Sequence, residues 1–294
     1  MNVKRPWAVW AAAGLMLAAL SGCGRSVAMV SEPEPNPELV KSIRGGGGEE
    51  EAAAAEPTAE AAPSGEPAGW GNLKGKFVFE GGAPAREAID TSKDPVCTQH
   101  PVLTEQIVVG DDGGLKDVVI YLASKKVPVN PEFEATANDK VLFDNKHCRF
   151  DPHVIVMRVS QTLELHNSDA SSHNSNIAPL GDAAFNSLIA DGATADYHFT
   201  KPQNLPVPVT CNIHPWMRGY ILPRDNPYAA VTGDDGSFEI KNLPAGAWEF
   251  QVWQEAAGYL AAKPEWKKGK FKMEIKPGDN DLGVIQVPAS LFKK

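Results

Sequence analysis

The chain has 294 residues, and its 28 basic and 37 acidic residues give a formal net charge of −9. A nucleic-acid-binding protein would call for clustered basic side chains, so this balance argues against that class. Once two N-terminal segments are set aside, residues 70–294 remain, which is enough for one large or two small domains.

The N-terminus has the pattern of a targeting segment rather than of a folded element. A basic start, Lys4-Arg5, precedes the apolar run 7–20, which is too short to span a bilayer comfortably. The next residues, Leu20-Ser21-Gly22-Cys23, resemble a bacterial lipoprotein box. This resemblance implies that residues 1–23 are a signal peptide and that Cys23 carries the lipid of the mature chain. The alternative is an ordinary secretory cleavage site with an incidental cysteine, and either interpretation takes the protein out of the cytoplasm.

Residues 24–69 are rich in Pro, Glu, Ala and Gly and have almost no aromatic side chains. Such a segment cannot bury enough apolar surface to offset the entropy lost on ordering, so we expect a disordered tether. It would hold the folded part away from the lipid membrane to which Cys23 attaches the chain.

The remaining residues predict an all-β protein. Short runs rich in β-branched and aromatic residues alternate with turn residues, as in β-sandwiches. No long segment shows helical periodicity. Strands are expected within residues 74–81, 115–122, 139–144, 153–159, 161–167, 206–212, 236–240, 248–253, 271–275 and 282–287.

The run CNIHPWM is the most informative motif for chemistry. It places Cys211, His214 and Met217 on one tight loop, and His173 stands upstream in a loop-like stretch, SDASSHNSNIAP. One thiolate, two imidazoles and a weak axial thioether form the ligand set of a blue copper electron-transfer site, whereas structural zinc prefers Cys and His without Met. A lone Cys-x-x-His would be weak evidence, and a methionine beside it is usually core. The four residues together are much harder to obtain by chance.

The run CNIHPWM resembles the ligand loop of the cupredoxins, in particular that of amicyanin and, more widely, plastocyanin. The pair His173-Asn174 resembles the upstream His-Asn pair of the same family. Ile213 before His214 and the extra histidine His166 depart from the family pattern, but neither removes a ligand. The resemblance covers roughly residues 135–224. It implies one type 1 copper with His173, Cys211, His214 and Met217 as ligands, and Asn174 as a hydrogen-bonding neighbour of the sulfur.

A second resemblance lies in the C-terminal part. The stretch AVTGDDGSFEIKNLPAGAWEFQVW resembles the carboxypeptidase regulatory-like, transthyretin-like β-sandwich, a resemblance that implies a fold and no catalysis. We therefore expect a cupredoxin domain at 135–225 and this second sandwich at 226–294. Within 70–134, GNLKGKFVFEGG and GLKDVVIYL resemble the opening strands of the same sandwich. This segment is either an N-terminal β extension, or part of an accessory sandwich into which the copper domain is inserted.

Two cysteines remain after Cys23 and Cys211 are assigned. Cys97 and Cys148 would lie in an oxidising compartment where thiols tend to pair, which favours a disulfide between them. The alternatives are two free buried thiols, or a second metal site that uses Cys148 and His153.

Together these features predict a one-electron carrier rather than an enzyme, anchored to a bacterial membrane on the periplasmic side or at the cell surface. Four protein ligands leave no open position for a substrate, unlike a catalytic metal site. The acidic folded part can steer a basic redox partner such as a c-type cytochrome, or an oxidoreductase. The edge formed by His214 and Trp216, on the loop expected to reach the surface, is the predicted electron exit. The alternatives are a copper-binding or copper-delivery protein, which methionine-rich or multiple Cys/His clusters would favour, and a structural cell-surface module.

Overall fold

The computed structural model describes residues 66–292. This part contains seventeen β-strands and four short 3-10 helices, so the expected all-β class is confirmed. Among the described residues, no helix is long and apolar enough to cross a membrane. The signal peptide 1–23 with Cys23, and residues 24–65 of the expected tether, lie outside the described residues.

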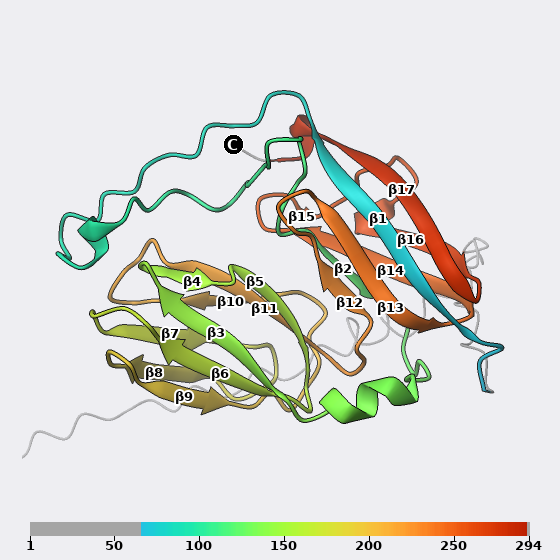
Figure 1. Ribbon diagram of the computed structural model, residues 1–294, viewed down its shortest axis with the longest axis horizontal. Helices are drawn as coiled ribbons and strands as arrows, with labels where there is room; N and C mark the ends of the chain where they lie inside the picture. Colours follow the sequence, from blue (N-terminus) through green and yellow to red (C-terminus); the bar gives the residue numbers. More distant parts are fainter. Residues whose placement is uncertain (1–65, 293–294) are drawn as a thin grey trace, which may run out of the picture. The chain divides into compact units, whose positions relative to one another are not determined.

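The first sandwich combines strands from both ends of the described chain (Figure 1). In its outer sheet, β1 (Trp70–Glu80) lies between an antiparallel β13 (Ser237–Pro244) and a parallel β17 (Gly278–Pro288). The facing sheet has the order β12-β2-β14-β15, with β16 added to β14. These strands are β2 (Val119–Leu122), β12 (Ala229–Val231), β14 (Gly246–Gln254), β15 (Gly258–Tyr259) and β16 (Lys270–Ile275).

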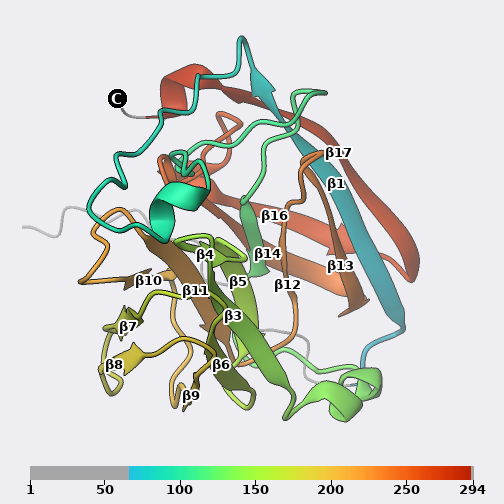
Figure 2. The ribbon, with the colours of Figure 1, turned by 60° about the vertical axis from the view of Figure 1, so that its left-hand side comes forward.

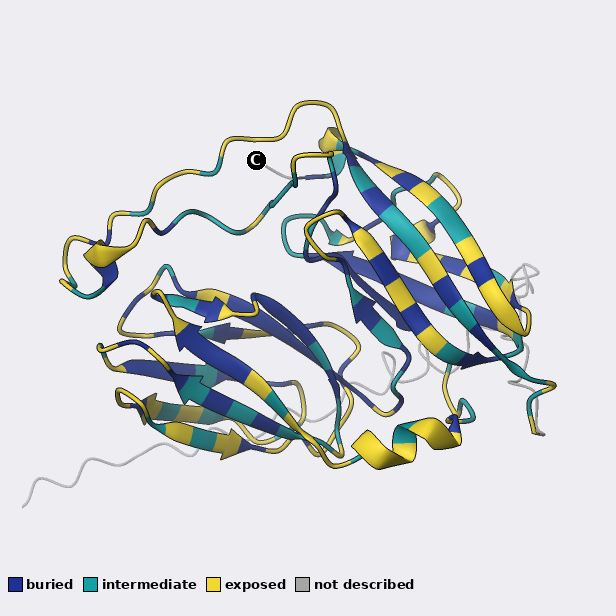
Figure 3. Ribbon diagram, in the orientation of Figure 1, coloured by how far each residue is buried: buried dark blue, intermediate teal, exposed yellow. Residues whose placement is uncertain are grey.

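Alternation of apolar and polar residues explains these strands. Buried and exposed positions form stripes along β1, β13 and β17 (Figure 3), as expected when one face of a sheet packs on a core and the other meets water. Inside, Phe271 stacks on Phe250 at 5.2 Å and on Trp266 at 4.5 Å between ring centroids. The short helices η3 (Lys267–Gly269) and η4 (Ala289–Leu291) border this sandwich.

The second sandwich occupies the middle of the chain, after β2 and η2 (Pro131–Thr136) and before β12. One sheet has the order β5-β11-β10-β7-β8 and the other β4-β3-β6-β9. The strands are β3 (Lys140–Lys146), β4 (Arg149–Asp151), β5 (Val154–Arg158), β6 (Thr162–Asn167), β7 (His173–Ile177), β8 (Phe185–Ile189), β9 (Thr194–Tyr197), β10 (Val207–Thr210) and β11 (Arg218–Arg224). Because β1 and β2 precede these strands and β12–β17 follow them, the second sandwich is inserted in the chain of the first.

Buried side chains join the two sandwiches. Those of β2 and β14 pack against those of β5 and β11 in one cluster: Val119, Tyr121, Val154, Tyr220, Leu222 and Trp253. Beside the cluster, the buried Arg224 lies over the Tyr121 ring at 4.8 Å and donates to the Leu122 carbonyl at 3.1 Å. The inserted sandwich is therefore packed directly on the sandwich that carries it.

A long excursion, residues 81–118, connects β1 to β2 and contains η1 (Cys97–Gln99). Its two arms are joined by the Ile89 N–H, which donates to Val102 O at 2.9 Å, and the Thr104 N–H, which donates to Glu87 O at 2.9 Å. At its tip, Cys97 forms a disulfide with Cys148, in the turn between β3 and β4. Figure 2 shows η1 next to β4. The excursion, which connects two strands of the first sandwich, thus contacts the second sandwich at its tip.

Candidate metal centre

Two neighbouring strands bring three ligating side chains together. β10 pairs antiparallel with β7, and Cys211 follows β10 directly. His173 is the first residue of β7, so the expectation that it lies in a loop is wrong. His214 comes from the loop between β10 and β11. The potential ligand atoms of His173, Cys211 and His214 all lie within 4.8 Å of one another, and all three residues are buried.

The two imidazoles point the same ring atom at the centre. His173 Nδ1 and His214 Nδ1 are 2.9 Å apart, and Cys211 Sγ is 3.9 Å from His214 Nδ1. The remote nitrogens face carboxylates: His173 Nε2 lies 3.0 Å from Asp169 Oδ2, and His214 Nε2 lies 2.9 Å from Asp94 Oδ2. With the protons on Nε2 donated to these carboxylates, two Nδ1 lone pairs and one sulfur converge. Such a set of acceptors fits a metal cation, in the carboxylate–histidine arrangement common at metal sites.

Met217 closes the ligand loop. Its N–H donates to His214 O at 2.9 Å, and its carbonyl accepts the Cys211 N–H at 3.3 Å. Its side chain is buried in the same apolar cluster as Cys211. The thioether, a soft ligand suited to Cu(I), thus belongs to the same loop and the same buried cluster as the thiol.

Asn174 ties the strand of His173 to the loop of Cys211. Its N–H donates to Cys211 Sγ at 3.5 Å, and its Oδ1 lies 3.5 Å from the same sulfur. That Oδ1 also accepts the Asn212 N–H at 2.7 Å, while Nδ2 donates to Asn186 Oδ1 at 2.7 Å. The sulfur is therefore held by a network that reaches across β7, β8 and the ligand loop.

Hydrogen bonds shift the ionisation of the metal-free ligands. Burial raises the pKa of Cys211, but hydrogen bonds from His173 and from the Asn174 N–H outweigh it, and the net pKa is lowered. Burial lowers the pKa of His173, but hydrogen bonds with Asp169 and Cys211 reverse this and raise it to about 9. Without metal, the charged forms of His173 and Cys211 thus stabilise each other. A metal cation binds to the same deprotonated ligand atoms and displaces the proton.

The prediction that His214 presents an edge to the surface is wrong. His214 is only 3% exposed, because the excursion places Asp94 Oδ2 at 2.9 Å and Cys97 Sγ at 3.9 Å from its Nε2. Trp216 is half-buried, with its ring 5.0 Å from that of His214, and it donates to Cys148 O at 3.2 Å. The exposed residues of the ligand loop are Asn212, Ile213 and Pro215, and Ile213 has 48% exposure. Nothing in the motif itself signals this cover.

The disulfide expected between Cys97 and Cys148 is confirmed, and Cys211 is the free cysteine of the described residues. With its sulfur in a disulfide, Cys148 is not available for a second metal site with His153. Instead, His153 Nε2 lies 2.7 Å from Glu255 Oε2, between the two sandwiches.

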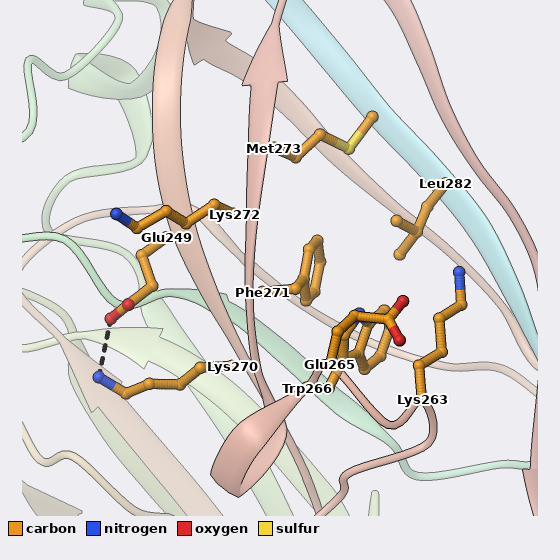
Figure 4. A pocket seen from close by; sticks show the side chains of 9 residues that line it. All are labelled: Glu249, Lys263, Glu265, Trp266, Lys270, Phe271, Lys272, Met273 and Leu282. Carbon is orange, nitrogen blue, oxygen red and sulfur yellow. Dashed lines mark hydrogen bonds and ion pairs between the residues drawn. The ribbon is translucent and has the colours of Figure 1, made fainter.

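A separate pocket lies on the first sandwich, over β14 and β16 (Figure 4). The stacked Trp266 and Phe271 rings form its apolar part, and Lys270 Nζ pairs with Glu249 at 2.7 Å at its rim. Its other lining residues are Lys263, Glu265, Lys272, Met273 and Leu282. None of the converging ligands contributes to this pocket, so it is distinct from the metal centre.

Comparisons with known proteins add a distant likeness. No protein-family model matches the chain, and no curated protein matches it. A reduced amicyanin mutant is 19% identical with a TM-score of 0.27 and covers 36% of this chain and 98% of its own. Another reduced amicyanin mutant is 20% identical, with a TM-score of 0.26 and the same coverage. A novel purple cupredoxin from Nitrosopumilus maritimus is 19% identical with a TM-score of 0.25 and covers 29% of this chain and 99% of its own.

Proposed function

We propose that this protein is a one-electron carrier with a single type 1 copper, held by His173, Cys211, His214 and Met217. The observation that carries the proposal is the buried convergence of two Nδ1 atoms and one sulfur within 4.8 Å. The thioether of the same loop favours copper over structural zinc. Copper bound there would accept and release one electron by alternating between Cu(I) and Cu(II).

The chain's own groups suit a carrier. Buried ligands exclude water, and Asn174 with the Cys211–Met217 backbone bonds holds the sulfur in place. Three of the four ligands share one short loop on a rigid β-scaffold, which keeps their positions through a change of charge. A centre enclosed in this way offers no position for a substrate, which supports electron transfer rather than catalysis.

We further propose an extracytoplasmic location, with the chain anchored to a bacterial membrane through Cys23. The Cys97–Cys148 disulfide supports it, since such bonds persist in oxidising compartments. The partner would be a redox protein such as a c-type cytochrome or an oxidoreductase. In this proposal the first sandwich is a transthyretin-like accessory module that covers the copper loop with its excursion.

Visible absorption of the copper-loaded protein tests the function. We expect an intense blue band from thiolate-to-copper charge transfer in the oxidised form, reversibly bleached by one electron. Cys211→Ser should abolish the band, whereas His198→Ala, which changes a histidine outside the centre, should preserve it. A Cys211→Ser protein that stayed blue would refute the ligand assignment. A colourless and readily exchanged Cu(I) would favour copper delivery instead.

A further inference from the structure

The remote side of the ligand His214 is occupied by a residue of the other sandwich. Asp94 belongs to the excursion between β1 and β2, and its Oδ2 lies 2.9 Å from His214 Nε2. The same oxygen accepts a hydrogen bond from Ser171 Oγ at 2.6 Å, and Oδ1 accepts the Val96 N–H at 2.8 Å. Both carboxylate oxygens are therefore engaged, and the one nearest His214 is fixed from two sides.

The backbone around Asp94 is held as firmly as its side chain. Its N–H donates to Thr91 O at 3.0 Å, and its carbonyl accepts the Thr98 N–H at 3.2 Å. Cys97, in the same turn, is joined covalently to Cys148 of the second sandwich. The position of the carboxylate is thus set by the tip of the excursion and does not depend on the ligand loop.

The two histidine ligands differ in how they are supported. His173 lies in β7, and the carboxylate on its Nε2 comes from Asp169, four residues earlier in the chain. His214 lies in a loop, and the partner of its Nε2 comes from a residue 120 positions away. The strand ladder restrains His173 in addition to its carboxylate, whereas the orientation of the His214 ring depends on contacts from outside its loop.

We propose that Asp94 is a positioning residue for the metal ligand His214, supplied by the first sandwich. It accepts the Nε2–H of His214, which selects the tautomer with its lone pair on Nδ1 and fixes the ring toward the centre. The identity of the metal rests on the proposed function, whereas the tautomer is a property of the metal-free chain.

A negative partner on the remote nitrogen also makes the imidazole a stronger electron donor. A stronger donor stabilises the more highly charged metal ion more than the less charged one, because the interaction grows with the charge. Asp94 should therefore stabilise Cu(II) relative to Cu(I) and lower the reduction potential. Loss of an outer partner of a histidine ligand typically weakens metal affinity about 10- to 100-fold.

The test compares Asp94→Asn and Asp94→Ala with wild type in the full chain. Asp90→Asn is the matched control, since it removes a negative charge from the same excursion at a carboxylate that hydrogen-bonds Ser92 and not a metal ligand. We expect both Asp94 variants to raise the reduction potential measured by spectroelectrochemistry, and Asp94→Ala to weaken Cu(II) binding about 10- to 100-fold. In metal-free protein, ¹⁵N NMR should show the Nε2–H tautomer of His214 in wild type and its loss in Asp94→Ala. Asp90→Asn should match wild type in every readout.

Unchanged potential and unchanged tautomer in Asp94→Ala would overturn the proposal. If Asp94→Ala does not fold, the reduction potential of the isosteric Asp94→Asn decides whether Asp94 has this role. A wild-type protein that binds no copper would refute the proposed function alone, because the tautomer in metal-free protein would still decide the role of Asp94.

Discussion

Removing the Cys97–Cys148 disulfide should cost the protein about 4 kcal/mol of unfolding free energy. The bridge joins residues separated by 51 positions. The loop-closure entropy for a loop of that length, multiplied by 298 K, gives about 4 kcal/mol. Both sulfurs are buried at the tip of the excursion, so lost packing acts in the same direction. The double variant Cys97→Ala Cys148→Ala removes the bridge. Because a chemical reductant would also act on bound copper, variant and reduced wild type are compared without metal.

Urea unfolding of metal-free protein, followed by tryptophan fluorescence, measures this cost. Wild type treated with reductant is the matched control, and it should lose a similar amount of stability. The m-value, the slope of unfolding free energy against urea concentration, should be larger in the variant, because the unfolded chain without the crosslink exposes more surface. A loss below about 1 kcal/mol would refute the loop-entropy reasoning and would point to residual structure in the unfolded chain without the bridge.

Three further predictions concern the centre and its surroundings. Met217→Ala should retain the thiolate band but shift the reduction potential, and an unchanged potential by voltammetry would exclude an axial role. Burial raises the pKa of Asp117 from 3.8 to about 6, although the charge of His153 opposes this shift. The stability that depends on protonated Asp117 is therefore fully present below pH 3.8 and is lost as the pH rises through about 6. Asn tolerates the φ of 60° at this position, and Asp117→Asn should raise the unfolding free energy at pH 8 by at most about 3 kcal/mol. In chemical denaturation, the unfolding free energy of this variant should also change less between pH 4 and pH 6. A pH dependence like that of wild type would assign the effect to another group. Gly219→Ala should lower Tm in thermal unfolding, because its Cβ would lie 2.7 Å from the Phe143 ring and 2.9 Å from the His153 carbonyl, and an unchanged Tm would contradict this packing.

Hydrophobicity explains many of the strands that the sequence predicts, and its absence explains one that it does not predict, β7. All ten expected ranges contain strands. Apolar and polar positions alternate along β13 and β16, whereas β2 is a continuous apolar run. The sequence does not predict β7, because its residues, HNSNI, are mostly polar although most of them are buried. The buried Asn174 is tolerated inside since it bonds to Asn212 and Asn186. A local hydrophobicity pattern cannot predict such hydrogen bonds, because their partners are distant in the chain.

The same distinction applies to the site. The sequence predicts three of the ligands, Cys211, His214 and Met217, because they lie within seven consecutive residues and together form a recognisable ligand set. Asp94 stands in the polar run TSKDPVC, which is indistinguishable from a surface loop, and its contact with His214 spans 120 residues. The covering of His214 therefore could not be inferred, because it depends on where the excursion folds and not on the residues beside the ligand.

The pairing of β1 with β17 has a consequence for the order in which the chain can fold. Within residues 66–292, the first strand, β1, pairs in parallel with the last one, β17, from Gly278 onward. During vectorial synthesis or export, the inserted sandwich with all four ligands is complete long before that neighbour emerges. A chain truncated ahead of Gly278 would leave β1 with an open edge, the kind of edge that invites aggregation. Completion of the outer sheet is thus a late event that requires a chain extending through β17, and pairing of such distant segments is intrinsically slow.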